Sequence, residues 1–356
     1  MHFLIGLIAF VFMLSVIVII HELGHFLVAR HYGVYCREFS IGMGPALYQH
    51  QGKETIFSIR AIPFGGYVMM AGEDDNTEAD EEDWLNEVPA SKRLNNKPCH
   101  QQIAVMLAGI VMNVLLAWVL FIGLAMAKGY VVEDAKPIVY KVEENSVAQK
   151  AGLQKDDRIV EARCGKESIR PETQYDLLEW IQYNHDTIEL TVKRDNQTIN
   201  VNLKPIYDKE NSVYLIGYKA IAYARKTHWY EAFGNGTKNL WSSTTSIFTS
   251  LSHLIRGQGV ENLSGPVGIF TVTKKTAEMG LSSYLSLFAI ISLNIGIFNA
   301  IPIPALDGGR ILIVLIEKIM RRKVNQRLVE RIIMASFVFL MLIFVFATYN
   351  DIVRFL

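Results

Sequence analysis

Residues 3–25 read FLIGLIAFVFMLSVIVIIHELGH, an apolar run that leads without a break into two histidines and a glutamate. The apolar part, residues 3–20, is long enough to cross the hydrocarbon core of a bilayer as a helix. Ionisable side chains at membrane depth are costly and are kept mainly where they serve a site. His21, Glu22 and His25 therefore indicate a functional site at the end of a membrane span.

Further apolar runs follow at residues 103–127, 284–316 (with internal breaks) and 332–347. Together the four runs predict a polytopic α-helical membrane protein with about four transmembrane helices. The first run could instead be a signal peptide, but no Lys or Arg precedes it and no small-residue cleavage site follows it. The chain holds 35 basic and 35 acidic residues, so no global field indicates a nucleic-acid partner, and the lipid bilayer is the expected environment.

The orientation of the spans follows from the Lys and Arg residues near their ends. Basic residues gather at positions 30–37, 92–97 and 318–331. With four spans these three sets lie on one side of the membrane, which we therefore expect to be cytoplasmic. The HELGH end of the first span then faces the cytoplasm, and both termini and residues 128–283 lie outside.

The pattern between the apolar runs predicts four regions. Residues 1–127 hold the first two spans, and within them residues 34–72 alternate and turn as β-hairpins do. Residues 128–225 predict a small α/β domain, with strands at 138–142, 157–162, 187–193 and 197–203 and a helix at 173–183. Residues 226–283 form an amphipathic helix and linker, and residues 284–356 hold the last two spans. That amphipathic helix either lies along the membrane surface or packs on the α/β domain.

His21 and His25 are four residues apart, so on a helix their rings share one face and can bind one zinc ion. Glu22 can then take a proton from a water molecule that zinc has activated. The alternative to a metal site is that both histidines simply lie on the surface at the end of a helix. The three cysteines are odd in number and form no CxxC pair, so we do not expect cysteine ligands.

A catalytic zinc site needs a third protein ligand. Residues 292–310 read SLNIGIFNAIPIPALDGGR, and Asp307 is the sole acid between residues 284 and 316. Pro302 and Pro304 break helical hydrogen bonding, and the two glycines after Asp307 permit an unusual backbone path. Asp307 is therefore the predicted third ligand, although it could instead cap a helix that resumes at residue 311.

The pairing of HELGH with NAIPIPALDGG resembles the site-2 protease family of intramembrane zinc metalloproteases. The resemblance continues, in the same order, at FSIGMGP (39–45), IPFGGY (62–67), AGIVMN (108–113) and LSGPVG (263–268). The chain looks most like bacterial members of the RseP type, which carry a PDZ domain between the second and third spans.

This resemblance assigns roles to single residues of the chain. It implies that His21, His25 and Asp307 bind Zn²⁺ and that Glu22 is the general base. The residues that it implies for substrate positioning are Asn299, Asn113, Pro302 and Pro304. Packing between helices is the alternative for Asn113.

The resemblance also assigns the regions. Residues 34–72 resemble a membrane-associated β-hairpin element, which could bind an unwound substrate by strand addition. Residues 128–225 resemble one extracytoplasmic PDZ-like domain. Residues 136–138 lack the glycines that would cradle a peptide carboxylate, so we expect a steric filter rather than capture of free C-termini.

The expected function is hydrolysis of peptide bonds within transmembrane segments of single-pass membrane proteins, in a bacterial inner (plasma) membrane. The resemblance implies substrates of the anti-sigma-factor type, after a first cleavage, or signal-peptide remnants. One alternative is a non-catalytic membrane scaffold that uses the PDZ-like domain. Another is a membrane zinc protease that trims prenylated tails, but such enzymes pair HExxH with a later Glu, and no Glu here lies in a comparable apolar run.

Overall fold

The structure is a computed structural model that describes residues 2–73, 82–132, 135–195, 197–208, 213–221, 224–226, 228–258 and 264–355. Leu263, the first residue of the LSGPVG motif, lies outside these ranges. Contacts within the chain divide it into two compact units. Unit 1 comprises Met1–Leu124, Phe233–Ile247 and Glu261–Leu356, and unit 2 comprises Ala125–Ala232 and Phe248–Val260.

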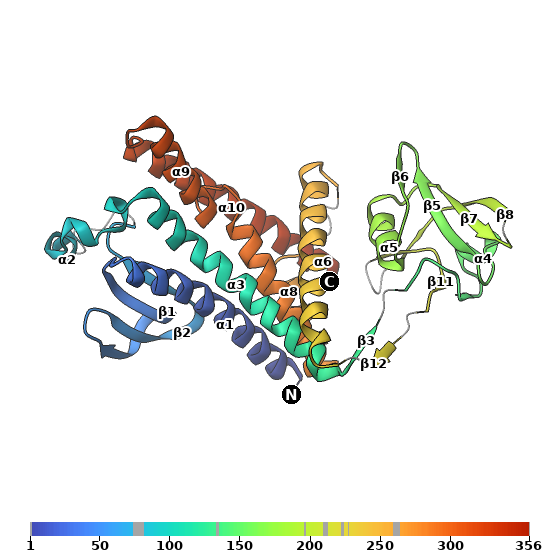
Figure 1. Cartoon of the computed structure of the whole chain (residues 1–356), viewed down its shortest axis with the longest axis horizontal. Helices are drawn as coiled ribbons and strands as arrows, with labels where there is room; N and C mark the ends of the chain where they lie inside the picture. The colour runs from blue at the N-terminus through green and yellow to red at the C-terminus, as the bar shows by residue number, and fades with distance from the viewer. Residues whose placement is uncertain are drawn as a thin grey trace. The chain divides into compact units, whose positions relative to one another are not determined.

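Among the described residues, four helices of unit 1 are long and apolar enough to cross a membrane. They are α1 (His2–His31), α3 (Cys99–Lys128), α8 (Leu281–Asn299) and α10 (Gln326–Phe355), all visible in Figure 1. The prediction of a polytopic helical membrane protein is thus confirmed. The third apolar run is not one element, however, because α8 ends before the two prolines and a separate helix, α9 (Asp307–Met320), follows them.

The long helices of unit 1 pack through several apolar clusters. Phe121 of α3 lies in a buried cluster with Leu293 of α8. A further helix, α7 (Pro266–Glu278), packs on the first half of α1, where the ring of Phe270 contacts Phe3 and Phe10 edge-on at 5.4 and 5.8 Å. The first half of the first span, α1, is therefore covered by α7.

Two long strands, β1 (Cys36–Gln51) and β2 (Ile56–Met70), form an antiparallel sheet beside α1. Residues 36–41 of β1 lie in its centre, because they pair with residues 56–59 of β2 on one side and residues 66–70 on the other. A buried carboxylate, Glu38, is paired with Arg60 at 2.7 Å. The sheet rests on α1 through rings of β1 and β2 that contact Phe26.

Unit 2 is built on a four-stranded antiparallel sheet with one main helix. Its strands, in the order β6–β5–β7–β8, are β6 (Glu167–Ile169), β5 (Arg158–Cys164), β7 (Ile188–Arg194) and β8 (Gln197–Leu203). The helix α5 (Gln174–Tyr183) begins with a capping box, in which the side chains of Thr173 and Asp176 each bond the other's backbone N–H. Its residues Leu177 and Ile181 are fully buried against the sheet.

The predicted strand at residues 138–142 is mostly irregular. Ile138 makes only an isolated bridge to Arg158, and the strand proper is β4 (Lys141–Val142), which pairs with β11 (Tyr218–Lys219). Other short elements are α2 (Glu82–Glu87), β3 (Tyr130–Val132), α4 (Val147–Lys150), β9 (Ile206–Asp208), β10 (Val213–Leu215) and β12 (Ala224–Lys226).

One buried ion pair lies within unit 2. Arg194 donates to both carboxylate oxygens of Asp157 at 2.7 Å, and the Asp157 side chain is fully buried. Burial alone would raise the pKa of Asp157, but the hydrogen bonds from Arg194 and from the backbone N–H of Gln154 outweigh it and hold that pKa below its usual value. The pair therefore stabilises unit 2 in its ionised form.

The predicted amphipathic helix is α6 (Glu231–Ile255), and it contributes residues to both units. In unit 1, the indole N–H of Trp118 donates to Thr237 at 2.9 Å, and Leu240 packs against the cluster of α3 and α8. In unit 2, the ring of His253 stacks on Tyr183 at 3.8 Å. Within unit 1 the middle of the helix thus packs on the spans, and its last turns belong to unit 2.

Candidate metal centre

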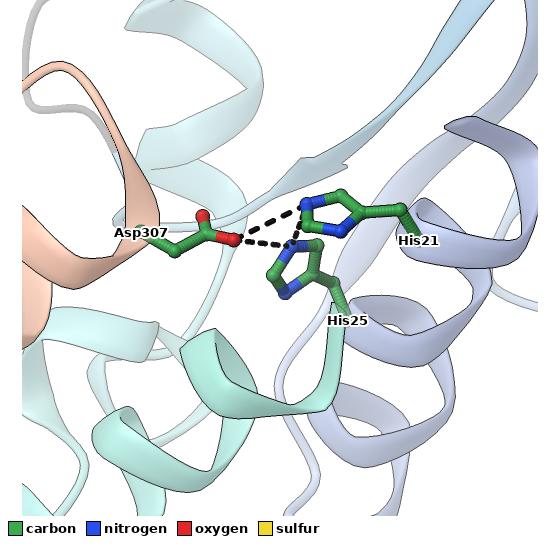
Figure 2. A group of neighbouring side chains, drawn as sticks. All are labelled: His21, His25 and Asp307. Carbon is green, nitrogen blue, oxygen red and sulfur yellow. Dashed lines mark hydrogen bonds and ion pairs between the residues drawn. The ribbon is translucent and has the colours of Figure 1, made fainter. Parts of the chain in front are cut away.

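Three side chains predicted as metal ligands meet in unit 1, as Figure 2 shows. The Nε2 atoms of His21 and His25 lie 3.1 Å apart, and Oδ2 of Asp307 lies 3.2 and 3.4 Å from them. A tetrahedral zinc ion with bonds of about 2.0–2.2 Å separates its ligand atoms by about 3.3–3.6 Å. The three separations are close to those values, and both histidines are buried.

Asp307 gives a second sign that the cluster fits a cation. Its Oδ2 atom is buried and faces the Nε2 atoms of both histidines, and an imidazole that carries its proton on Nδ1 donates no hydrogen bond to it. A buried carboxylate oxygen without a hydrogen bond is costly, whereas a metal ion would satisfy it. Two nitrogen donors and one carboxylate are a ligand set that zinc accepts.

Both histidines are oriented by groups on α3 that bind their second ring nitrogen. The Nδ1 atom of His25 lies 2.8 Å from the carbonyl oxygen of Val105, so it carries a proton and leaves Nε2 free for a metal. The side-chain amide of Asn113 lies 3.3 Å from Nδ1 of His21 and is fully buried. The amide atom that faces this ring nitrogen in the structure is Nδ2. A metal on Nε2 of His21 would leave the proton on Nδ1, and the amide would then have to turn over to present its oxygen to it.

Glycines let α1 and α3 approach closely at the site. A Cβ atom on Gly109 would lie 2.4 Å from Nε2 of His25 and 2.7 Å from Cε1 of His21. A Cβ atom on Gly24 would lie 2.5 Å from the carbonyl oxygen of Ala108. The sequence motif HELGH therefore needs its glycine for helix packing, and the glycine of AGIVMN makes room for the two imidazoles.

The loop between α8 and α9 positions Asp307. It is the first residue of α9, and the two glycines that follow are helical rather than in a left-handed conformation. A Cβ atom on Gly308 would lie 2.3 Å from the carbonyl oxygen of Ala300, and one on Gly309 would lie 2.1 Å from that of Ile303. The expectation of an unusual backbone path is thus wrong, because the glycines are needed for close approach of the preceding loop.

Glu22 lies one residue after the first histidine and is half-buried. Its Oε2 atom accepts a hydrogen bond from the backbone N–H of Val68 in β2 at 3.2 Å. This contact joins the sheet to the site, and sequence patterns gave no sign of it, because a backbone N–H has no residue-specific signature.

The remaining predicted residues lie around the loop that carries Asp307. Asn299 is the last residue of α8 and is half-buried, and Pro302 is exposed. Pro304 lines a cavity of about 590 Å³ together with Met106 of α3 and Phe337 of α10. The structure therefore places these residues near the site in the chain, without a contact that fixes their role.

Comparison with known proteins identifies the family of the chain. The sequence profile of peptidase family M50 matches residues 9–343, which includes all three clustered side chains. The chain belongs to peptidase family M50. It is therefore a zinc metalloprotease of the site-2 type with membrane-spanning helices.

Several relatives of this M50 protease are similar over almost their whole length. A Clostridium perfringens protein named for zinc metalloprotease activity is 34% identical, with 99% of each chain covered. The regulator of sigma-W protease RasP from Bacillus subtilis is 30% identical, with 98% of each covered. The zinc metalloprotease RasP from Bacillus licheniformis is 29% identical, with 98% of each covered.

Proposed function

We propose that this M50 protease hydrolyses peptide bonds within the transmembrane segments of single-pass membrane proteins. The observation that carries the proposal is the position of the ligand cluster. His21 and His25 lie on α1, a helix apolar enough to span a membrane, and they are buried against α3. A zinc site in such a helix can meet substrates that are themselves in the bilayer.

In this proposal, His21, His25 and Asp307 hold the zinc ion, which supplies a Lewis acid that activates water at neutral pH. Glu22 takes the proton of the water as its oxygen attacks the carbonyl carbon of the peptide bond. The C–N bond then breaks, and Glu22 returns the proton to the departing amine. Val105 and Asn113 keep the two imidazoles in the orientation that this reaction needs.

A helical substrate hides its peptide bonds, so it must be extended before it is cut. The β1–β2 sheet supports strand addition, because residues 66–70 of β2 pair with β1 on one side and approach Glu22 through Val68. We assign Asn299, Pro302 and Pro304 to holding the extended chain, whereas Asn113, also predicted for this role, is fully buried beside His21. This sheet is the membrane-associated element of the proposal.

The substrates that we propose are anti-sigma-factor-like proteins, already clipped outside the membrane, and signal-peptide remnants. The name of the B. subtilis relative, regulator of sigma-W protease, supports the first class. The basic clusters of the chain favour a bacterial inner membrane topology in which the HELGH end faces the cytoplasm and residues 128–225 lie outside.

We further propose that residues 128–225 form a PDZ-like domain that acts as a size filter. PDZ domains bind peptides by adding a strand to the edge of a sheet. Here the side chain of Gln182 accepts from the N–H of Tyr214 and donates to its carbonyl oxygen, at 2.8 and 3.1 Å. The hydroxyl of Tyr218 also bonds Gln174, so α5 is tied to β10 and β11 near both of its ends.

The test is cleavage of a single-span protein in liposomes. Wild type and Glu22→Gln are compared, each with and without a zinc chelator. Product that disappears with the substitution and with the chelator supports the proposal. Product formed at the parent rate by Glu22→Gln, with zinc content equal, would show that Glu22 is not the base.

A further inference from the structure

The backbone N–H of Val68 points away from the sheet that contains it. Alternate residues of a strand direct their N–H groups to opposite sides. Ala71, three residues further along, donates to the carbonyl oxygen of Tyr35, on the side of β1. Val68 therefore directs its N–H to the other side, where Oε2 of Glu22 accepts it.

Val68 is held firmly in this position. Its side chain is 7% exposed and lies in a buried cluster with Phe39 of β1 and Val105 of α3. The end of its strand is fixed by the hydrogen bond of Ala71 to Tyr35 and by one from the N–H of Leu94 to Ala71. The N–H that Glu22 binds is thus a fixed group, whereas the carboxylate stands at the end of a side chain with several single bonds.

A peptide that adds to residues 66–70 needs this N–H. Strand addition uses the outward N–H and C=O groups of the edge, and Val68 lies in the middle of the stretch that pairs with β1. A carbonyl oxygen of the added strand and the carboxylate of Glu22 cannot both take the single hydrogen of that N–H at full strength.

We propose that an extended substrate displaces Glu22 from the N–H of Val68, so that docking itself releases the base toward the metal centre. The inference rests on the proposed function and deepens it, since it names the group that senses the substrate. Val68 is then a positioning residue that acts through Glu22. Without substrate, the base is tied to the strand edge; with a strand in place, it is free to take a proton.

The experiment compares substrate binding by Glu22→Ala and Glu22→Gln. Both variants lack the charge and the base, and His21, His25 and Asp307 stay intact. The glutamine side chain of the second variant keeps an oxygen that accepts the N–H of Val68, whereas the alanine of the first has no acceptor. A fluorescent single-span substrate with a helix-breaking segment is titrated into each purified, zinc-loaded variant in nanodiscs, and the Kd is measured.

We expect Glu22→Ala to bind about 2- to 12-fold more tightly than Glu22→Gln, the net worth of one hydrogen bond. The cycle is completed with Val68→Pro, which removes the N–H at an edge where proline is tolerated, and with Val68→Ala, which keeps it. The difference between the two Glu22 variants should vanish with Val68→Pro and persist with Val68→Ala. Loss of packing alone would not produce that pattern.

Equal Kd values for Glu22→Ala and Glu22→Gln would overturn the inference. The comparison on the parent Val68 background decides the matter even if Val68→Pro fails to fold. Cleavage by wild type is measured alongside. If wild type is active and chelator-sensitive while both variants bind equally, only the proposed competition between substrate and Glu22 for the N–H of Val68 is refuted. An inactive wild type would instead count against the proposed function.

Discussion

Substitution of Gly109 by alanine should weaken the binding of zinc by the protease. The added Cβ atom would lie 2.4 Å from Nε2 of His25 and 2.7 Å from its Cε1. Non-bonded carbon contacts are normally about 3.5–4.0 Å, so the ring would have to move by about 1 Å. Ligand distances in metal sites tolerate only about 0.2 Å.

The ring of His25 has little room to yield. Its Nδ1 atom is bonded to the carbonyl oxygen of Val105, which lies one turn before Gly109 on the same helix. Moving the ring breaks this bond, and such outer partners alone are worth about 10- to 100-fold in metal affinity. We therefore expect Gly109→Ala to lower zinc affinity at least about tenfold and to lower cleavage with it.

The measurement is zinc content per chain after dialysis against graded chelator, followed by the rate of cleavage in liposomes. Gly123→Ala is the matched control, because Gly123 lies on the same helix and a Cβ atom there would meet nothing within 4 Å. Alanine favours a helix over glycine at both positions, so propensity cannot explain a loss. Zinc retention and activity equal to those of Gly123→Ala would refute the reasoning.

Three further outcomes follow from contacts in the two units. Asn113→Ala removes the amide beside Nδ1 of His21, and chelator competition should show a zinc affinity lower by about tenfold or more. Asp307→Ala removes the third ligand, so zinc should be lost at chelator concentrations that wild type resists, while circular dichroism shows the helices intact. Asp157→Asn breaks the pair with Arg194, and hydrogen exchange in β5 and β7 should become faster at pH 7. Because the folded pKa of Asp157 is lowered, the wild-type advantage is complete above the unfolded pKa of about 3.9 and is lost as the pH falls through the lower folded value; an advantage that grew on acidification would contradict this.

Much of the site could be predicted because its side chains are ionisable and the surrounding sequence is apolar. The spacing of His21 and His25 and the isolation of Asp307 in an apolar run led to the cluster that the structure shows. The groups that orient these side chains had no such signature. The carbonyl oxygen of Val105 and the N–H of Val68 are backbone atoms, and any residue type would offer them.

The fold was harder to predict where an apolar stretch could belong either to a membrane span or to a helix that packs on the spans. The apolar stretch at residues 284–316 resembles one broken span, but the prolines end α8, and the apolar residues beyond them belong to α9. The middle of α6 is apolar on one face for packing against α3 and α8, a partnership that no local pattern specifies. Which helix packs against which depends on contacts between residues far apart in the sequence. A short window of sequence does not contain that information.

The metal centre joins residues that lie far apart along the sequence. His21 and His25 lie on α1, whereas Asp307 follows α8 and is therefore made after them. A growing chain on the ribosome therefore carries only two of the three ligands until α1, α3 and α8 have been made. Biogenesis thus delays the appearance of a working protease, because the ligand set is incomplete until Asp307 has joined it.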